Sequence, residues 1–567
     1  LGIVQEQSVL PLSWEEEVPL TIATGCGGDV RKSINTLEIA YLSAPIENNV
    51  RTISAQQLQS GIVVINNATG DIVALAGGVG EKTDFFAYNK ATQAKLQTGS
   101  VQKPLSVYAP AFEKGGLSPA TVIPDLPLTY DGGAWPKNDS RVYNYSRTIF
   151  QGIVSSINAI SANTLSRIGA DTGFSFAKYN FQQNYLVDSY VSSNGTPMSD
   201  IAIAPLALGA LTIGSTVREV TAAYATFANN GVIRTARTYT KVYDSDGKIV
   251  LDNQQESQQI LSEKAVNYMN YCLYNAANNG TGTVAVFPGQ NIAGKTGTTS
   301  SNRDRWFAGY TKYYTAAVWC GYNQPEQIYL TNNYQNPAGR LWKMVMQPIH
   351  NGLPNAALYN GNAFQNVNIC LDSGKLATAA CSADVRGINR VVSVNCYPED
   401  VPTEYCDKHV QVDYCVTGGG VATDYCRQSP DAVIESRSLV RLTQSEVESI
   451  RSGLRVGLDG VYGNDNYVYF VDNYGNPLAW SGFNGFANNL TMSPYLTCPL
   501  HTQDTIFNFP TQPGDDLLGG DNGNIIYPNG TTNGTGSIGG DGIFNGGITS
   551  PGEYFPGQNG DSGNVIF

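Results

Sequence analysis

The chain has 567 residues, of which 42% are hydrophobic and 14% charged, and its formal net charge is −13. This length suits roughly two to four domains, and the hydrophobic content favours a packed globular protein over a disordered chain. Because the balance is acidic and no run of lysine or arginine stands out, nucleic acid and anionic membrane surfaces are not expected as partners. No window approaches ~18 unbroken apolar residues, so the sequence predicts no segment that spans a bilayer.

Changes in composition divide the chain into four regions. We interpret residues 1–59 as a linker or partial domain, 60–350 as the main domain, 351–510 as a Cys-rich extension module and 511–567 as a Gly/Asn-rich tail with no assigned function. The chain begins at Leu1 without a signal-peptide pattern, so we expect a trimmed ectodomain whose anchor precedes residue 1.

A strand hairpin opens the main domain. Residues 61–66 and 72–76 are short β-branched runs joined by Asn/Gly/Asp turn chemistry. A helix is then predicted over 101–113 and ends before Gly115. Pro104 fits the first turn of this helix, because its missing N–H would have no intrahelical partner there.

The later part of the main domain returns to strands. Apolar residues at helical spacing predict helices over 153–168 and 217–229. Three strands and a covering helix follow, at 291–297, 305–311, 315–322 and 341–348. Strands at both ends with helices between them indicate an α+β domain in which the early hairpin joins the late strands.

The extension is rich in cysteine. Seven of the ten cysteines lie there: Cys370, Cys381, Cys396, Cys406, Cys415, Cys426 and Cys498. Clustering at short spacing favours a disulfide-stapled module outside the cytosol. The best single pairing that we predict joins Cys370 to Cys381.

A metal site is the alternative interpretation of this region. Cys406 and His409 form a Cys-x-x-His pair that Cys498 and His501 repeat, and four such ligands can make one closed zinc site. Free buried thiols are a third interpretation. Disulfides are favoured, so no metal and no cofactor is expected. A helix over 444–453 and a strand over 467–472 are also predicted here.

Ser100 and Lys103 form a Ser-x-x-Lys pattern, which predicts a nucleophile beside its own base. Ser100 begins the predicted helix, so its hydroxyl lies at the positive end of the helix dipole. The spacing of three puts Lys103 on the same face one turn later. A desolvated lysine that faces a second lysine can lose its proton and act as a base. The alternative is a helix capped by a serine, with a solvated lysine.

The second lysine belongs to the Lys-Thr-Gly segment formed by Lys295, Thr296 and Gly297. On an edge strand, Gly297 would let a ligand backbone approach closely. The hydroxyls of Thr296 and Thr298, with the charge of Lys295, would bind a carboxylate. The backbone N–H groups of Ser100 and Thr298 would form an oxyanion hole. The alternative is an ordinary β-turn.

A Ser-x-Asn element should supply a hydroxyl for proton transfer and an amide that orients the substrate. Only two such pairs lie at the start of, or within, the helical stretch after the nucleophile helix: Ser156 with Asn158, and Ser161 with Asn163. The residue pattern leaves both open.

Together these motifs resemble the transpeptidase domain of class A penicillin-binding proteins over about residues 61–348. The matching blocks are residues 61–78, 99–104, 222–231 and 293–310, in family order. The resemblance implies an α+β fold of the penicillin-binding and serine β-lactamase-like type, a five-stranded antiparallel sheet flanked by helices. Its spacing favours Ser156 and Asn158 as the third element.

The roles that the resemblance implies are a nucleophile with its base, a proton relay with an amide holder, and a carboxylate-binding set: Ser100 and Lys103, Ser156 and Asn158, and Lys295, Thr296 and Thr298. The role of Lys103 as base is a hypothesis, because which lysine takes the proton is disputed in related enzymes. The implied reaction is D,D-transpeptidation of peptidoglycan stem peptides through a Ser100 acyl-enzyme, with β-lactams as acylating inhibitors. The alternatives are a D,D-carboxypeptidase or β-lactamase-type hydrolase, and a non-catalytic cell-wall scaffold.

Class A members also carry a glycosyltransferase domain, whose motif joins a glutamate to a nearby histidine. The three histidines of this chain come late: His350, His409 and His501. We therefore expect that domain to be absent from this chain, which is then either a transpeptidase fragment or a relative that lacks the polymerase. A separate glycosyltransferase is the partner that the second alternative implies. The resemblance implies a place on the extracytoplasmic face of a bacterial membrane or in the cell wall.

Overall fold

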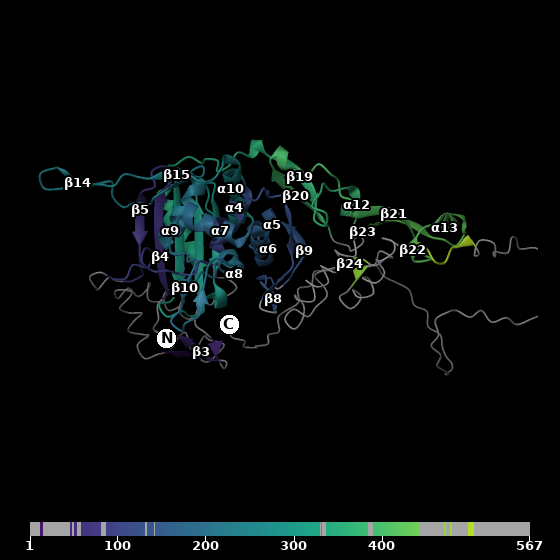
Figure 1. The fold of residues 1–567 in the computed structure, drawn as a ribbon, viewed down its shortest axis with the longest axis horizontal. Helices are drawn as coiled ribbons and strands as arrows, with labels where there is room; N and C mark the ends of the chain where they lie inside the picture. Colours follow the sequence, from purple (N-terminus) through teal and green to yellow (C-terminus); the bar gives the residue numbers. More distant parts are fainter. Residues whose placement is uncertain are drawn as a thin grey trace, which may run out of the picture. The chain divides into compact units, whose positions relative to one another are not determined.

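Figure 1 shows the fold in the computed structural model of the chain. The structure describes residues 58–440, apart from 81–86, 131–132, 141, 329, 331–335 and 384–388, together with 12–14, 46–47, 50–53, 470–471, 477–478 and 497–503.

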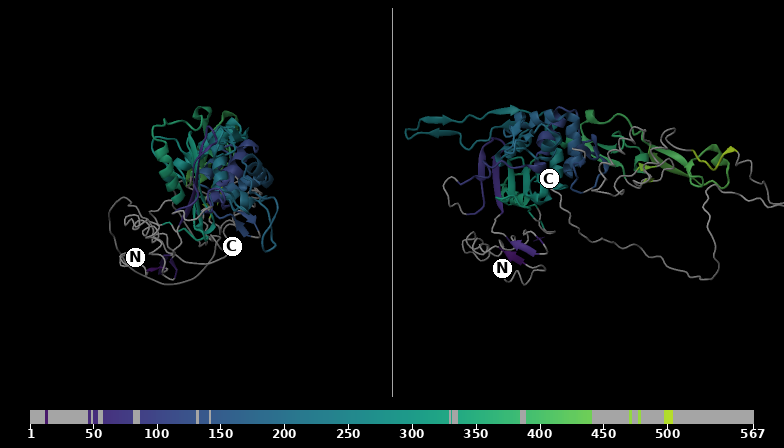
Figure 2. Two further views of the ribbon diagram at one scale, coloured as in Figure 1. Left: turned by 90° about the vertical axis from the view of Figure 1, so that its left-hand side faces the viewer. Right: turned by 60° about the horizontal axis from the view of Figure 1, so that its bottom comes forward.

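One antiparallel sheet organises the main domain. Its strands are β4 (Gln59–Asn66), β5 (Ile72–Ala76), β16 (Ala293–Thr298), β17 (Asp304–Tyr310) and β18 (Tyr314–Gly321). Their order is β16-β17-β18-β4-β5, so the early hairpin lies beside strands that come much later in the chain (Figures 1 and 2). The predicted hairpin and the three late strands are confirmed, and they join in one sheet of an α+β domain.

The period of two along β4 decides which side chain serves which face of the sheet. Val63 packs into the core that includes α9 (Val217–Ala228), whereas Ile62 and Val64 pack into the core that includes α11 (Pro337–Ile349). Each such aliphatic side chain contributes roughly 1.5–3 kcal/mol when fully buried. The sheet is therefore covered on both faces and holds its edge strand β16 in place.

The helix predicted over 101–113 is divided into three segments of different helical type. η1 (Gly99–Val101) is a 3-10 turn, η2 (Pro104–Tyr108) is π-helical and α4 (Ala109–Glu113) is α-helical. Pro104 and Pro110 remove two N–H donors from the α-helical ladder, which is the physical reason for the irregular register.

The helix predicted over 153–168 is divided into α5 (Ile149–Val154) and α6 (Asn158–Ile168). The break contains Ser156, whose φ is 56°. Residues other than glycine rarely adopt this left-handed conformation, and none can do so inside a right-handed helix. The bend thus separates the serine from the helix that was expected to contain it.

Two further predicted helices are present. The one predicted over 217–229 is confirmed as α9, and the covering helix predicted over 341–348 is α11. α11 begins earlier than expected, because the side chain of Asn336 accepts a hydrogen bond from the N–H of Ala338 and caps it.

The other elements of the main domain are short apart from α10. They are β6 (Val122–Asp125), β7 (Leu128–Tyr130), β8 (Gly133–Trp135), β9 (Tyr145–Thr148), α7 (Ala170–Ser175), η3 (Phe176–Asn180), β10 (Tyr190–Val191), β11 (Pro197–Met198), α8 (Ile203–Leu208), β12 (Val232–Arg234), β13 (Lys241–Tyr243), β14 (Ile249–Asp252), β15 (Ser257–Gln259), α10 (Glu263–Asn278), η4 (Thr283–Ala285) and η5 (Ser300–Asn302).

The extension is built from small sheets and single helical turns. Its elements are η6 (Gly361–Ala363), β19 (Gln365–Cys370), α12 (Ala379–Ser382), β20 (Val391–Cys396), η7 (Pro398–Asp400), β21 (His409–Cys415), β22 (Gly420–Val421), α13 (Asp424–Gln428), β23 (Ile434–Val440), β24 (Phe470–Val471) and β25 (Pro477–Leu478). β19 pairs with β20, and β21 pairs with both β22 and β23.

The disulfide prediction for this module is wrong. All nine cysteines that the structure describes are free, and Cys370 is not joined to Cys381. Six thiols instead gather in two groups of three, each with one histidine. Short cysteine spacing is shared by disulfide and metal modules, and only the folded chain shows three sulfurs meeting one imidazole.

The alternative of a single zinc site is corrected too. Cys406 and His409 lie in one group, whereas Cys498 and His501 lie in the other. Each pair is joined by one cysteine from a strand and one from a short helix instead of by the other pair: Cys370 (β19) and Cys381 (α12), and Cys415 (β21) and Cys426 (α13).

Some predictions fall on residues that are not described. The helix at 444–453 and the tail at 511–567 lie outside the described residues, and the strand at 467–472 is described only as β24. Of residues 1–59, the structure describes little more than β1 (Leu12–Trp14), β2 (Ile46–Glu47), β3 (Val50–Ile53) and the start of β4. The four-region division stays a prediction.

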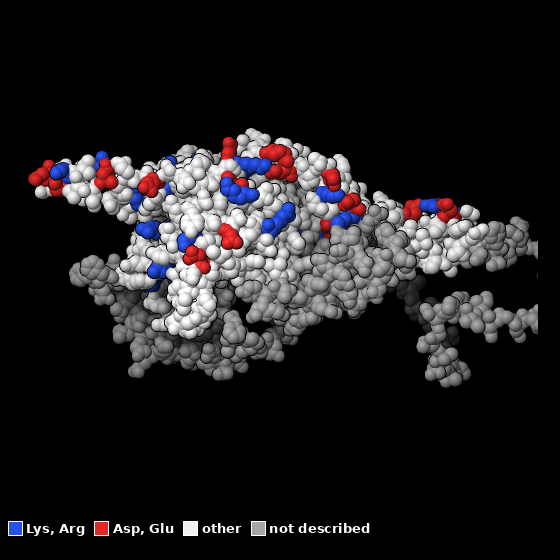
Figure 3. Space-filling model, viewed as in Figure 1, with Lys and Arg blue, Asp and Glu red and all other residues white. Residues whose placement is uncertain are grey.

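Two further findings concern membrane-spanning helices and surface charge. Among the described helices, none is long and apolar enough to cross a membrane. Figure 3 shows acidic and basic side chains interspersed over the face that it presents.

Candidate active site

Ser100 lies in η1, and two side chains hold the turn from outside. The hydroxyl of Tyr224 donates a hydrogen bond of 2.8 Å to the carbonyl of Val101. The indole N–H of Trp306 donates one of 2.9 Å to the carbonyl of Gln97. Because α9 carries the tyrosine and β17 carries the tryptophan, both the helical layer and the sheet fix the position of the serine backbone.

Glycines bring the edge strand β16 against this turn. A Cβ on Gly99, whose φ is 55°, would lie 2.8 Å from the carbonyl carbon and 3.0 Å from the amide nitrogen of Thr298. A Cβ on Gly297 would lie 2.6 Å from the carbonyl oxygen of Thr98 and 3.1 Å from a methyl group of Val101. The turn that carries Ser100 therefore fills the space beside Gly297. The expectation that a ligand backbone would approach this glycine is corrected, because Thr98 and Val101 lie there instead.

Lys103 and Lys295 are both fully buried. Burial lowers the pKa of Lys295 to about 7. Burial, and then the charge of Lys295, lower the pKa of Lys103 well below its usual value, while the charge of Asp139 acts in the opposite direction. Desolvation penalises the charged form of each amine, and a second ammonium nearby adds to that penalty. We therefore expect at least one lysine of the pair to be neutral near pH 7.

The bend between α5 and α6 supplies the partners of Lys103. The Lys103 Nζ donates to the carbonyl of Ser156 at 2.9 Å and to Oδ1 of Asn158 at 2.6 Å. Nδ2 of Asn158 donates to the carbonyl of Lys137 at 2.8 Å. A left-handed non-glycine residue such as Ser156 costs roughly 1–3 kcal/mol, and such strain is concentrated at functional sites.

The other Ser-x-Asn pair has structural partners. The hydroxyl of Ser161 donates to the carbonyl of Ala207 at 2.8 Å, and Nδ2 of Asn163 donates to the carbonyls of Leu126 and Ala159, both at 2.9 Å. The structure thus brings Ser156 and Asn158 to Lys103, and it uses the second pair to join helices and strands.

The threonines of β16 have different neighbours. Oγ1 of Thr296 lies 2.7 Å from Oγ1 of Thr281. Oγ1 of Thr298 accepts a hydrogen bond of 3.1 Å from Nη1 of Arg305. A guanidinium therefore lies directly beside the hydroxyl that was predicted to bind a carboxylate.

Arg305 is the residue that the sequence analysis missed at this site. Burial lowers its pKa, and its Nε is buried without a hydrogen-bond partner among the described residues. Its place follows from the register of β17, in which Arg305 lies opposite Thr298. An assignment of that register would have found it, since directly opposed residues of an antiparallel pair lie close together.

Such a site has the parts for acyl transfer: a serine hydroxyl at a helical turn, two amines of lowered pKa and a sheet edge with cations beside it. The family comparison agrees with this geometry. The model of the penicillin binding protein transpeptidase domain matches residues 60–347, which is half of the chain. The chain belongs to the penicillin-binding protein transpeptidase family. A second model, of the penicillin-binding protein 1A C-terminal domain, matches residues 363–411.

Curated relatives carry related names. Penicillin-binding protein 1A of Clostridium botulinum strain Hall is 29% identical over 422 residues, which are 72% of this penicillin-binding protein and 48% of that relative. Penicillin-binding protein 1F of Bacillus subtilis is 32% identical over 299 residues, which are 51% of this chain and 39% of that relative. The chain thus spans less than half the length of these relatives.

A solved structure supports the fold. Penicillin-binding protein 1A from Haemophilus influenzae has a TM-score of 0.50 and 22% identity, and the match covers 62% of this chain and 54% of that chain. The transpeptidase fold expected from the sequence, with its five-stranded antiparallel sheet, is therefore confirmed.

Proposed function

We propose that this penicillin-binding protein is a D,D-transpeptidase that crosslinks peptidoglycan stem peptides through an acyl-enzyme on Ser100. The observation that carries the proposal is the pair of buried lysines, Lys103 and Lys295, beside a serine turn that glycines hold against β16. Burying two amines is unfavourable unless at least one is neutral, and a neutral amine is the base that a serine needs.

The hydrogen bonds of Lys103 suit the neutral form. A neutral amine has two N–H donors and one lone pair. The two donors have acceptors in the carbonyl of Ser156 and Oδ1 of Asn158. This leaves the lone pair to take the proton of the Ser100 hydroxyl as the oxygen attacks the substrate carbonyl.

The edge strand would hold the donor peptide. Lys295 and Arg305 supply positive charge for its terminal carboxylate, and the hydroxyls of Thr296 and Thr298 supply donors. The N–H groups of Ser100 and Thr298 would stabilise the oxyanion that forms on the attacked carbonyl. The proton then passes through Ser156 to the leaving D-alanine, and an amine from a neighbouring strand resolves the ester.

This function implies partners and a location. The partners would be stem peptides, β-lactams that acylate Ser100, and a polymerase that makes the glycan strands, either a separate glycosyltransferase or a domain beyond this chain. The place of action would be the extracytoplasmic face of the bacterial membrane or the cell wall, where the substrate is found.

Penicillin labelling tests the proposal. A fluorescent penicillin should form a covalent adduct that maps to the peptide containing Ser100, and the Ser100→Ala chain should take no label. The label should persist for hours if an amine acceptor, and not water, resolves the acyl-enzyme. Rapid release would show a β-lactamase-type hydrolase instead. With a D-alanyl-D-alanine peptide and an amine acceptor, the product should be the new amide, whereas a carboxypeptidase would give only the hydrolysed peptide.

The pH dependence of acylation should be bell-shaped and displaced toward acid. The rate should rise as Lys103 loses its proton, at a pH well below the usual lysine pKa, and fall as Lys295 loses its proton near pH 7. A second-order rate constant measured against pH reports these values for the free enzyme. A penicillin ester lacks the carboxylate that Lys295 would bind, so it should lose the descending limb. The same descending limb with both ligands would remove the proposed role of Lys295.

A further inference from the structure

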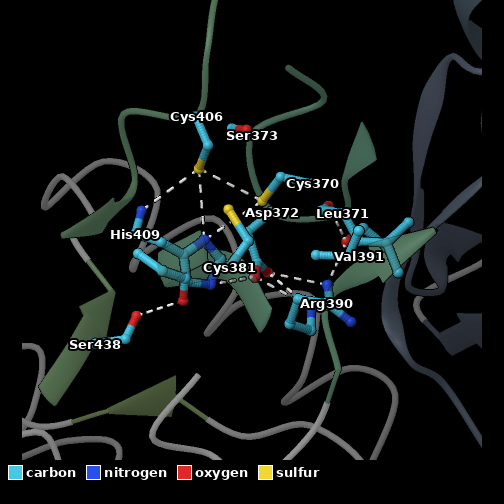
Figure 4. A network of polar contacts seen from close by, with 12 residues as sticks. Cys370, Leu371, Asp372, Ser373, Cys381, Arg390, Val391, Cys406, His409 and Ser438 are labelled. Atoms are coloured by element: carbon cyan, nitrogen blue, oxygen red, sulfur yellow. Dashed lines mark hydrogen bonds and ion pairs between the residues drawn. The ribbon is translucent and has the colours of Figure 1, made fainter. Parts of the chain in front are cut away.

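The extension contains two groups of ligand-type side chains. The first consists of Cys370, Cys381, Cys406 and His409, and the second of Cys415, Cys426, Cys498 and His501. In each group one ligand atom per residue lies within 4.8 Å of the other three, and all eight residues are buried. Figure 4 shows the sulfurs of the first group converging on the ring of His409.

The spacing of these atoms suits a tetrahedral ion. In the first group, the sulfurs of Cys370 and Cys406 are 3.5 Å apart, and each lies 3.4 Å from Nδ1 of His409. In the second, the sulfurs of Cys415 and Cys498 each lie 3.3 Å from Nδ1 of His501. Zinc–sulfur and zinc–nitrogen bonds in a tetrahedron place ligand atoms about 3.5–3.8 Å apart, whereas a disulfide requires about 2.05 Å.

The two groups are copies of one motif. In each group the first two cysteines are eleven positions apart, and the last cysteine and the histidine are three positions apart. The first two cysteines of the second group, Cys415 and Cys426, each lie 45 positions after their counterparts Cys370 and Cys381. A glycine of positive φ follows the first cysteine by four positions in both, with φ of 71° at Gly374 and 70° at Gly419. The chain therefore repeats the geometry as well as the ligand types.

Backbone and hydroxyl contacts are repeated too. The N–H and the hydroxyl of Thr378 lie 3.3 and 3.4 Å from the sulfur of Cys381, and those of Thr423 lie at the same distances from the sulfur of Cys426. The N–H of Cys406 donates to the carbonyl of Leu376 at 2.8 Å, and the N–H of Cys498 makes the matching bond at 2.8 Å to the carbonyl of Val421. N–H and O–H groups directed at a sulfur stabilise a thiolate, which is the form that binds metal.

Both histidines have a carboxylate on the far side of the ring. Nε2 of His409 lies 3.3 Å from Asp372, and Nε2 of His501 lies 3.4 Å from Asp431. The buried Asp372 beside Nε2 of His409 holds the proton there and leaves Nδ1 free as a ligand, which is the usual arrangement behind a metal-bound histidine. Asp431 is half exposed, and Nε2 of His501 makes no hydrogen bond among the described residues.

Alternatives to a metal leave the module without a core. Each group has three thiols, so one disulfide would leave an unpaired thiol. The buried apolar residues at the centre of each group are the three cysteines themselves, with only a few partly buried neighbours. Modules this small usually need a staple in place of a hydrophobic core.

We propose that the extension binds two structural zinc ions, one in each Cys₃His group. Three thiolates and an imidazole suit zinc, and four protein ligands close the coordination sphere, so each ion has a structural and not a catalytic role. The first group lies within the region matched by the C-terminal domain model, and the second group lies entirely beyond it.

The first centre is also joined to the main domain. Asp372, which supports His409, accepts from Arg390 at 2.9 Å, and Arg390 donates to the hydroxyl of Ser146 in β9 at 2.7 Å. That hydroxyl donates to the carbonyl of Leu371 at 2.6 Å. The ion would therefore fix one of the turns through which the extension contacts the transpeptidase domain, in addition to the contacts of Tyr397 and Asp400 with α10.

Metal analysis of the whole chain tests the proposal. Protein purified without chelator should carry two zinc ions per chain, with the six thiols of the two groups unreactive to a thiol reagent until zinc is removed. Cys381→Ser and Cys426→Ser should each retain one ion. Cys396→Ala removes a buried cysteine of the same module that belongs to neither group, so it should retain two.

Because loss of a structural ion can unfold the module, two further measurements keep the test decisive. Co²⁺ added to the metal-free chain should give the intense absorption of tetrahedral cobalt thiolate centres, at two equivalents. His409→Cys keeps four ligands and should retain both ions, whereas Asp372→Asn should weaken the first site about 10- to 100-fold. Disulfides in unreduced peptides, or the absence of both zinc uptake and the cobalt spectrum, would overturn the proposal. One equivalent that is unaffected by Cys426→Ser would overturn the second centre.

Discussion

Replacing Lys103 by methionine is expected to slow the acylation of Ser100 by penicillin about 10²- to 10⁴-fold, the usual contribution of a positioned general base. The amine is fully buried, its pKa is lowered by burial and by Lys295, and its donors are taken by Ser156 and Asn158. Methionine keeps the length of the side chain and removes the lone pair. Stopped-flow measurement of acylation with a chromogenic or fluorescent β-lactam checks this rate.

Stability should change little in the same variant. Removing a desolvated amine relieves the free-energy cost of burying it. Each of the two acceptors that lose their donor costs roughly 1–3 kcal/mol, so the two effects oppose each other. Lys114→Met is the matched control, because Lys114 follows the same helix with a side chain that is 64% exposed, and it should acylate like the parent chain. If Lys103→Met also acylated at the parent rate, the proton acceptor would be another group, with Lys295 the next candidate.

Adding a single methyl group at Gly99 should have an effect of similar size. In Gly99→Ala, the new Cβ would press on the backbone of Thr298, 2.8 Å from its carbonyl carbon, so the serine turn and β16 must separate. A displacement of about 1 Å in a catalytic site can reduce the rate 10²-fold. We expect a loss of at least that size in acylation, together with a lower unfolding temperature.

Gly116→Ala separates the contact from the backbone strain. Gly116 has a φ of 61°, close to the 55° of Gly99, but nothing lies within 4 Å of the place that its Cβ would take. Both variants should lose roughly 1–2 kcal/mol of stability through a left-handed alanine, yet only Gly99→Ala should lose acylation. Equal acylation in the two variants would show that the approach of β16 to Ser100 does not matter for the reaction.

The sheet was predictable because its signals are local. The hairpin of β4 and β5 follows from β-branched runs around a turn, and its union with β16, β17 and β18 follows from the distribution of strands along the domain. The irregular register of the nucleophile helix was harder to see, since it depends on how Pro104 and Pro110 combine within one short segment.

The sequence motifs named the candidate catalytic residues, but their contacts came only from the structure. Sequence motifs selected Ser100, Lys103 and Lys295, but their spacing contains no information about burial or about which amine is neutral. The role of Arg305 and the reason for glycine at 297 depend on register and on contacts between segments about 200 residues apart.

The sequence by itself determined the five strands of the main sheet, the helices α9 and α11 that cover it, the serine, lysine and threonine motifs, and the concentration of cysteines in one module. Only the tertiary structure decided that Asn158 contacts Lys103 while Asn163 does not, and that the cysteines form two separate Cys₃His groups instead of disulfides. The physical reason is the same in both cases. A motif fixes which atoms are available, whereas desolvation and the meeting of side chains from distant segments are properties of the folded chain.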